Sequence, residues 1–148
     1  MPRRRHFLLR PWVIHPERYN IMSENLSFLV VDDEELICEV LKETILMWYP
    51  DAIIDTAEDG LEGFHKLSSH NYSMMVVDYK MPYFNGADLI SALRDKEGHN
   101  QNLPIIMFSG FIPDVENLLS TFDKVFFLDK PMDLEKFQKY IRFSIATT

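Results

Sequence analysis

The sequence is poor in cysteine, in positive charge and in long hydrophobic runs. Its single cysteine, Cys38, cannot form a disulfide within the chain, and it lies in an amphipathic stretch where a free thiol acts as a small core residue. A formal net charge of -8 disfavours direct nucleic-acid binding, which needs Lys and Arg to replace phosphate counterions. No run approaches the roughly 18 apolar residues that a membrane helix requires. These absences leave a globular protein, which we expect to be cytoplasmic.

The charge is unevenly distributed between the start of the chain and the rest. Residues 1–21 carry five arginines against one glutamate, a net charge of +4, so the remaining chain carries -12. Arg10 and Pro11 interrupt the short apolar run after the first arginines, so we do not expect a signal peptide. We expect residues 1–25, which lack periodicity, to form a basic flexible extension; a basic arm that contacts an acidic partner is the alternative. Residues 26–148 then form one domain.

From Ser27 onward, short apolar runs alternate with amphipathic stretches, a pattern typical of repeated βα units around a parallel sheet. The predicted strands are residues 28–31, 53–57, 74–77, 105–108 and 125–128. The predicted helices are residues 37–48, 61–69, 87–95, 115–122 and 134–144. Five such units predict an α/β fold, a flavodoxin-like doubly wound sheet of five parallel strands in the order 2-1-3-4-5.

Chemically reactive side chains follow the central strands, at the edge of the sheet where such folds bind ligands. Asp32 and Asp33 follow the first strand, and Asp78 follows the third. Ser109 follows the fourth strand, and Lys130 lies just beyond the fifth. Because the carboxyl ends of parallel strands share one edge, the sequence predicts that three carboxylates, a hydroxyl and an ammonium group meet in one crevice.

Three neighbouring carboxylates need a positive charge between them, since two like charges about 4 Å apart repel by roughly 4 kcal/mol at an effective dielectric near 20. Mg²⁺ is the natural candidate, because it prefers oxygen ligands and commonly bridges carboxylates to phosphate oxygens. Lys130 and the Ser109 hydroxyl can hold phosphoryl oxygens, and Gly110 lets a phosphate approach the backbone. Asp78, alone at the end of the central strand, is therefore the best candidate for a nucleophile in phosphoryl transfer.

Each of these residues also has a structural explanation when it is taken singly. Asp32 or Asp33 can simply cap the helix that follows. Lys130 and Pro131 can form an exposed turn, and Ser109 can satisfy a loop amide. The predicted convergence of all of them at one sheet edge favours the chemical explanation.

In this combination the sequence closely resembles the receiver domain of bacterial response regulators. The matching segments are Phe28-Leu-Val-Val-Asp-Asp-Glu, Val76-Val-Asp-Tyr-Lys-Met-Pro82 with Gly86, Phe108-Ser-Gly110 and Phe127-Leu-Asp-Lys-Pro131. Their order and spacing, over about residues 27–145, form a signature far more specific than any single motif.

The resemblance implies a phosphoacceptor and not a turnover enzyme. A histidine kinase or phosphotransfer protein would donate a phosphoryl group from histidine to Asp78, and the domain would assist its own phosphorylation and dephosphorylation. The resemblance also implies a Mg²⁺ site formed by Asp33, Asp78 and the backbone carbonyl of Lys80, with Asp32 acting through water.

A conformational switch is a further implication of the resemblance. In the family the residue at the Ser109 position moves toward the phosphoryl group, and the aromatic residue at the Phe127 position turns inward. Since Phe127 stands where tyrosine is common, burial alone must drive this turn. The switch changes the face formed by the fourth helix, the fifth strand and the fifth helix. Family members often pair through that face, so a homodimer is one expectation. Four apolar residues could form the contact or could instead belong to the core: Leu118, Leu119, Phe122 and Phe126.

Two side chains are expected to overhang the phosphoryl site. Lys80 lies two residues beyond Asp78, and Phe111 lies two residues beyond Ser109. We hypothesise that the bulky Phe111 hinders the attacking water and lengthens the lifetime of the phosphorylated state. An unchanged dephosphorylation rate in Phe111→Ala would show this hypothesis to be wrong.

Three other classes of protein compete with this interpretation. The first is a receiver-like interaction module whose output does not depend on phosphorylation. The second is a hydrolase of the haloacid dehalogenase type, which is disfavoured because such enzymes place a second Asp where this chain has Lys80. The third is a flavodoxin, which is disfavoured because neither its phosphate-binding loop nor a glycine-rich fingerprint is visible.

Overall fold

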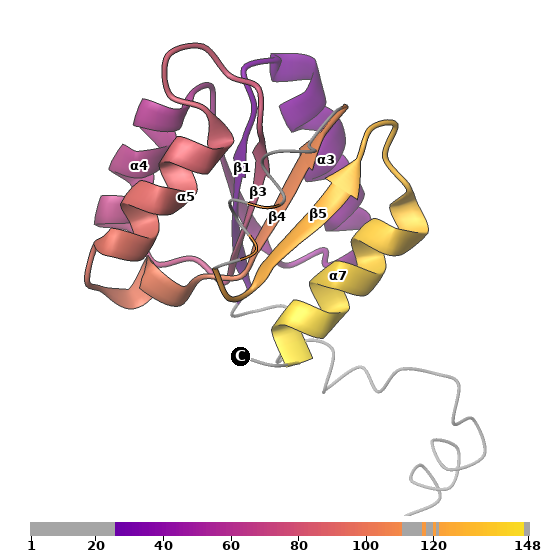
Figure 1. Ribbon diagram of the computed structural model, residues 1–148. Coiled ribbons are helices and arrows are strands. Elements are labelled where there is room, and N and C mark those ends of the chain that lie inside the picture. The colour runs from indigo at the N-terminus through magenta and orange to yellow at the C-terminus, as the bar shows by residue number, and fades with distance from the viewer. Residues whose placement is uncertain (1–25, 111–116, 118–119, 121, 147–148) are drawn as a thin grey trace, which may run out of the picture.

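A computed structural model describes residues 26–110, 117, 120 and 122–146, and Figure 1 shows how its elements are layered. The strands are β1 (Ser27–Val31), β2 (Ile53–Ala57), β3 (Met74–Asp78), β4 (Ile105–Ser109) and β5 (Val125–Asp129). They pair in parallel in the order β2-β1-β3-β4-β5. The predicted flavodoxin-like strand order is confirmed.

Helices cover both faces of the sheet (Figure 1). α3 (Glu35–Trp48) and α7 (Leu134–Ala146) lie on one face, and α4 (Gly60–Ser69) and α5 (Gly86–Asp95) lie on the other. A short 3₁₀ helix, η1 (His99–Asn102), precedes β4 and was not predicted. The helix expected at residues 115–122 falls largely outside the described residues, as does the whole extension of residues 1–25. Within the part that is described, no helix is both long and apolar enough to span a bilayer.

The strands alternate their side chains between two apolar cores, one under each helical layer. The core on the α3 and α7 side contains Phe28, Val30, Met74, Val76, Ile106 and Phe108. The core on the α4 and α5 side contains Leu29, Val31, Met75, Val77, Ile105 and Met107. Full burial of one such side chain contributes about 1.5–3 kcal/mol to the stability of the fold. Strands covered on both faces therefore appear in the sequence as continuous apolar runs.

Several strands extend one residue further than their apolar runs predicted. Asp78 still belongs to β3 and pairs in register with Phe108, while Ser109 of β4 pairs with Asp129 of β5. The backbone ladder continues past the last apolar side chain because its hydrogen bonds do not depend on side-chain polarity. Polar groups at this edge are therefore held by regular strand backbone.

The loop after β3 is tight, and Gly86 is the residue that allows it. A Cβ at Gly86 would lie 2.6 Å from the carbonyl oxygen of Asp78 and 2.8 Å from Met107 Cε. The Gly86 amide donates to the Tyr79 carbonyl over 2.9 Å, which closes the loop. α5 then begins with a capping box between Asn85 and Asp88. The close approach fixes the segment that carries Asp78.

Candidate functional site

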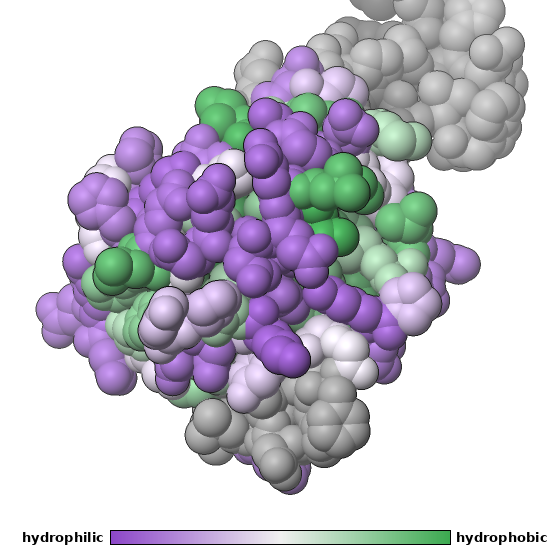
Figure 2. All heavy atoms as spheres, turned by 90° about the horizontal axis from the view of Figure 1, so that it is seen from above, coloured by the Kyte–Doolittle hydropathy of each residue, from purple (hydrophilic) through white to green (hydrophobic). Residues whose placement is uncertain are grey.

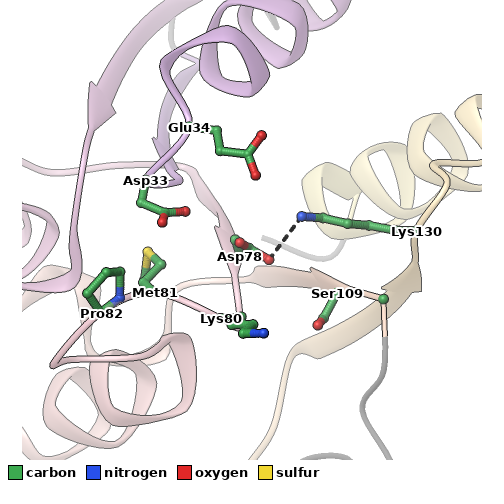
Figure 3. A pocket seen from close by; sticks show the side chains of 9 residues that line it. Asp33, Glu34, Asp78, Lys80, Met81, Pro82, Ser109 and Lys130 are labelled. Carbon is green, nitrogen blue, oxygen red and sulfur yellow. Dashed lines mark ion pairs between the residues drawn. The ribbon is translucent and has the colours of Figure 1, made fainter.

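Three carboxylates meet at the carboxyl ends of β1 and β3, which are neighbours in the sheet. Asp32, Asp33 and Asp78 each offer an oxygen, and these oxygens all lie within 4.8 Å of one another. Asp32 and Asp78 are buried, whereas Asp33 is exposed. The predicted convergence of acidic side chains is present in the structure. Figure 3 shows Asp33 and Asp78 in one pocket, which Glu34 also lines.

Lys130 approaches the same pocket from the far side, beyond β5 (Figure 3). Its Nζ lies 3.3 Å from Asp78 Oδ1, and its side chain is 34% exposed. The Lys130 amide donates to the Ser109 carbonyl over 3.0 Å, which ties the loop after β5 to the end of β4. The peptide bond between Lys130 and Pro131 is cis. Lys130 is thus an ion-pair partner of Asp78 and not merely part of an exposed turn.

Burial and mutual repulsion make both buried carboxyl groups reluctant to ionise. The pKa of Asp32 is raised to about 6, chiefly by burial and further by the charges of Asp78 and Asp33; the Glu34 amide and Lys130 oppose the increase. Burial likewise raises the pKa of Asp78, against the opposing effect of the Lys130 ammonium. One lysine does not neutralise the group of three carboxylates.

Two carboxylate oxygens in the site lack a hydrogen-bond partner among the described residues: Asp32 Oδ2 and Asp78 Oδ1. Asp32 uses its other oxygen, Oδ1, to accept from the Glu34 amide over 2.8 Å. Asp78 Oδ1 has the ion pair with Lys130 but no hydrogen bond, and Asp32 Oδ2 has neither among the described residues. Since buried polar atoms are nearly always paired, this indicates a site for a ligand. Clustered hard oxygen donors match the preference of Mg²⁺, and the donor set therefore fits this ion.

The other predicted site residues lie around the same pocket. Ser109 is buried at the end of β4 and lines the pocket with Gly110 and the exposed Lys80. Phe127 is half-buried and packs against the core on the α4 and α5 side. Phe111 lies outside the described residues, so the hypothesis about it stays a prediction.

Asp32 accepts from the Glu34 amide at the start of α3, but neither Asp32 nor Asp33 is the N-cap residue. The N-cap of α3 is Glu34, which makes no side-chain capping bond. Sequence reasoning did not identify Glu34, Met81 and Pro82, which also line the pocket. All three belong to the segments that match the receiver family, which was the available signal for them.

The face of the molecule above the strand ends is mainly polar. Figure 2 views the structure from above, onto the carboxyl ends of the strands, and shows hydrophilic residues broken by small hydrophobic patches. A polar opening of this kind suits a charged, water-soluble group more than an apolar ligand.

The chain matches the family model of the response regulator receiver domain over residues 28–142. It therefore belongs to the family of receiver domains of two-component response regulators. These domains are signalling modules that accept phosphoryl groups, and they are generally not turnover enzymes.

Curated relatives agree with this assignment. The chain is 34% identical to the sensor protein EvgS of Escherichia coli K12 over 85 residues, which are 57% of this chain and 7% of EvgS. It is 29% identical to the response regulator ArlR of Staphylococcus aureus Mu50 over 124 residues, which cover 78% of this chain and 51% of ArlR. The chain thus spans only a small part of EvgS and about half of ArlR.

Solved structures share the fold. The receiver domain of the Francisella response regulator 1452 superposes with a TM-score of 0.69 at 27% identity, covering 83% of this chain and 98% of that one. The chemotaxis protein CheY4 of Vibrio cholerae gives a TM-score of 0.71 at 22% identity, covering 80% and 98%. The receiver domain of a sensor histidine kinase of Pseudomonas aeruginosa, whose active-site cleft holds a magnesium ion, gives 0.70 at 17% identity, covering 82% and 98%.

Proposed function

We propose that Asp78 accepts a phosphoryl group from a phosphohistidine donor, either a histidine kinase or a phosphotransfer protein, in a two-component phosphorelay. The observation that carries this proposal is the contact between Lys130 and Asp78, 3.3 Å apart, beside two further carboxylates. Lys130 comes from beyond β5 and Asp78 from β3, so the sequence brings these groups together only through the fold. Membership of a phosphoryl-accepting family supports the same role.

The proposal includes a Mg²⁺ ion as cofactor. Asp33, Asp78 and the backbone carbonyl of Lys80 would hold the ion, and Asp32 would act through water. When bound, the ion supplies charge neutralisation for the phosphoryl oxygens. The open oxygens of Asp32 and Asp78 support this assignment, as does the magnesium in the cleft of the similar Pseudomonas domain.

The proposed transfer needs little from the protein beyond position and charge. A carboxylate oxygen of Asp78 forms a bond to phosphorus while the bond from phosphorus to the donor imidazole nitrogen breaks, and that nitrogen keeps the electron pair. Lys130 neutralises one phosphoryl oxygen, and the Ser109 hydroxyl donates to another. We propose that Lys80 and Phe111 modulate the water attack that later releases phosphate; of the two, only Lys80 belongs to the described residues.

The same proposal assigns Ser109 and Phe127 to a conformational switch. Ser109 ends β4, and Phe127 of β5 pairs in register with Met107, two residues before Ser109. Phe127 is only half-buried, so an inward turn when Ser109 shifts toward the phosphoryl group would bury more of its ring. We propose that the movement alters the surface formed by the predicted helix at residues 115–122, β5 and α7, and that copies of the chain pair through this surface.

Intact-protein mass after incubation with Mg²⁺ and acetyl phosphate tests the proposal. We expect the added mass of one phosphoryl group, located on the peptide that contains Asp78 and absent from Asp78→Asn. Asp129→Asn removes an exposed carboxylate at the end of β5 and should be phosphorylated normally. A folded protein that gains no phosphoryl group, or one that gains it in Asp78→Asn, would refute the proposal. Steady release of phosphate from small phosphoesters would instead favour the hydrolase.

A further inference from the structure

The Lys130 ammonium has a second contact, with an aromatic ring that is not a member of the acidic cluster. Nζ lies 5.0 Å from the centroid of the Phe108 ring, within the range of a cation–π interaction. Phe108 is only 2% exposed and belongs to the core on the α3 and α7 side. The ring is therefore fixed by its surroundings, whereas the lysine that lies over it is a long side chain with several rotatable bonds.

Register explains why Phe108 is the residue beneath this lysine. Phe108 pairs with Asp78 of β3 on one side and with Leu128 of β5 on the other. Adjacent strands lie about 4.8 Å apart, so the lysine must cross the width of β4 to reach Asp78. The Phe108 position is the point on β4 that Lys130 crosses.

The ring attracts the ammonium without using its hydrogen-bond donors. A cation–π contact acts on the charge through the negative face of the ring, so the three N–H groups stay available for oxygen. The ion pair with Asp78 acts on the same ammonium, with Nζ 3.3 Å from Asp78 Oδ1. The ring therefore adds to this ion pair without competing for the same N–H donors.

We propose that Phe108 is a positioning residue that holds the Lys130 ammonium toward the phosphoryl site while leaving its N–H groups open to phosphoryl oxygens. This inference rests on the proposed function, since it deepens the role given there to Lys130. It predicts that the strength of the aromatic π-face at residue 108, and not only its size, sets the rate of phosphoryl transfer.

Stepwise fluorination of the Phe108 ring in the full chain tests the inference. Replacement by monofluoro-, difluoro- and trifluorophenylalanine weakens the negative face of the ring while nearly preserving its shape. We expect the rate of phosphorylation by acetyl phosphate at saturating Mg²⁺ to fall stepwise, by about fivefold in total. Mg²⁺ affinity should stay constant, because the ion contacts carboxylates and not Lys130. A purely structural role for the ring predicts no such trend.

Phe28 provides a matched control, because it is fully buried in the same core and belongs to β1. The same fluorinated series at Phe28 should leave the rate unchanged. In a Lys130→Met background, the trend at residue 108 should disappear from the residual rate. Phe108→Leu should also lose rate, although its packing differs.

Equal rates across the Phe108 series, in proteins that are phosphorylated on Asp78, would overturn this inference and leave the proposed function intact. A trend of the same size at Phe28, or one that persists without Lys130, would overturn it too. Absence of phosphorylation in the unmodified chain would instead refute the proposed function.

Discussion

Buried polar side chains are satisfied at the amino ends of the strands and left open at the carboxyl ends. Asn100 of η1 is buried, and its Oδ1 accepts from the Tyr72 amide over 3.0 Å. Its Nδ2 donates to the carbonyls of Leu67 and His70 over 2.7 and 2.6 Å. Three short hydrogen bonds from one amide join α4, the start of β3 and η1.

Arg94 works in the same way at this end of the sheet. Its guanidinium donates to the carbonyls of Gln101 and Leu103, each over 2.8 Å, and to the carbonyl of Asp123 over 3.0 Å. These carbonyls belong to the segments that lead into β4 and β5. Each charge or amide here is matched by fixed partners, which is the arrangement expected where a polar group only stabilises the fold.

The acidic cluster at the opposite end is built differently. Asp32 and Asp78 are as deeply buried as Asn100, yet each keeps an oxygen without a hydrogen-bond partner among the described residues. Leaving such groups open lowers stability, so their retention indicates that a ligand completes them. The contrast separates polar groups that have fixed protein partners from polar groups that we propose bind a metal ion and a phosphoryl group.

Asp78→Asn, at the acidic end of the sheet, should have the largest effect on phosphorylation. We expect phosphorylation by acetyl phosphate to fall below detection, because an amide lacks the nucleophilic carboxylate oxygen. Quantitative mass spectrometry of the Asp78 peptide checks this expectation. Asn100→Ala, at the other end, should still be phosphorylated at a temperature where it is folded; a loss there would mean that the two ends are not separate in function.

Asn100→Ala should have the largest effect on stability. One buried amide N–H and two carbonyls lose their partner, so we expect the free energy of unfolding to fall by about 3 kcal/mol. Urea denaturation followed by circular dichroism measures the change. Asn102→Ala, at an exposed position of the same short helix, should change it little. Equal losses from both variants would show that the Asn100 network does not stabilise the fold.

Asp32→Asn should do the opposite and stabilise the protein in the absence of Mg²⁺. Removal of a buried, repelled charge should raise the free energy of unfolding at neutral pH by roughly 2 kcal/mol. Denaturation in the presence of a chelator gives the value. A destabilised Asp32→Asn protein would mean that Asp32 stabilises the fold like Asn100.

The pH dependence of stability follows from the same group. The folded-state pKa of Asp32 is about 6 against an ordinary value of 3.8, so the folded state binds this proton more tightly. The stabilisation that comes from this tighter proton binding is complete below pH 3.8 and is lost as the pH rises through about 6. The difference in unfolding free energy between the original protein and Asp32→Asn should follow this curve. A flat difference between pH 4 and 7 would contradict the assigned cause.

Mg²⁺ itself should have the smallest effect on the stability of the folded state. At about ten times its dissociation constant, the ion should stabilise the folded state by about 1.4 kcal/mol. Thermal denaturation with Mg²⁺ and with a chelator measures the difference, which should vanish in Asp33→Asn. The same stabilisation in that variant would place the ion elsewhere.

The sequence predicted the acidic end of the sheet much better than the amino end. Apolar runs located β1, β3 and β4, and the parallel fold then placed Asp78 and Lys130 at one edge. The amide and guanidinium network did not appear in the prediction, because the four residues of η1 show no periodicity. The contact between Lys130 and Phe108 was also missed, since it depends on strand register, which the run lengths did not specify to one residue.

A crystal structure with Mg²⁺ and beryllofluoride would show whether Asp78 is the phosphoryl acceptor. We expect beryllium bonded to a carboxylate oxygen of Asp78, with fluorine atoms within hydrogen-bonding distance of Lys130 Nζ and Ser109 Oγ and the metal on Asp33. Beryllofluoride bonded to another carboxylate, or a Lys130 side chain turned into solvent beside an occupied Asp78, would contradict this expectation.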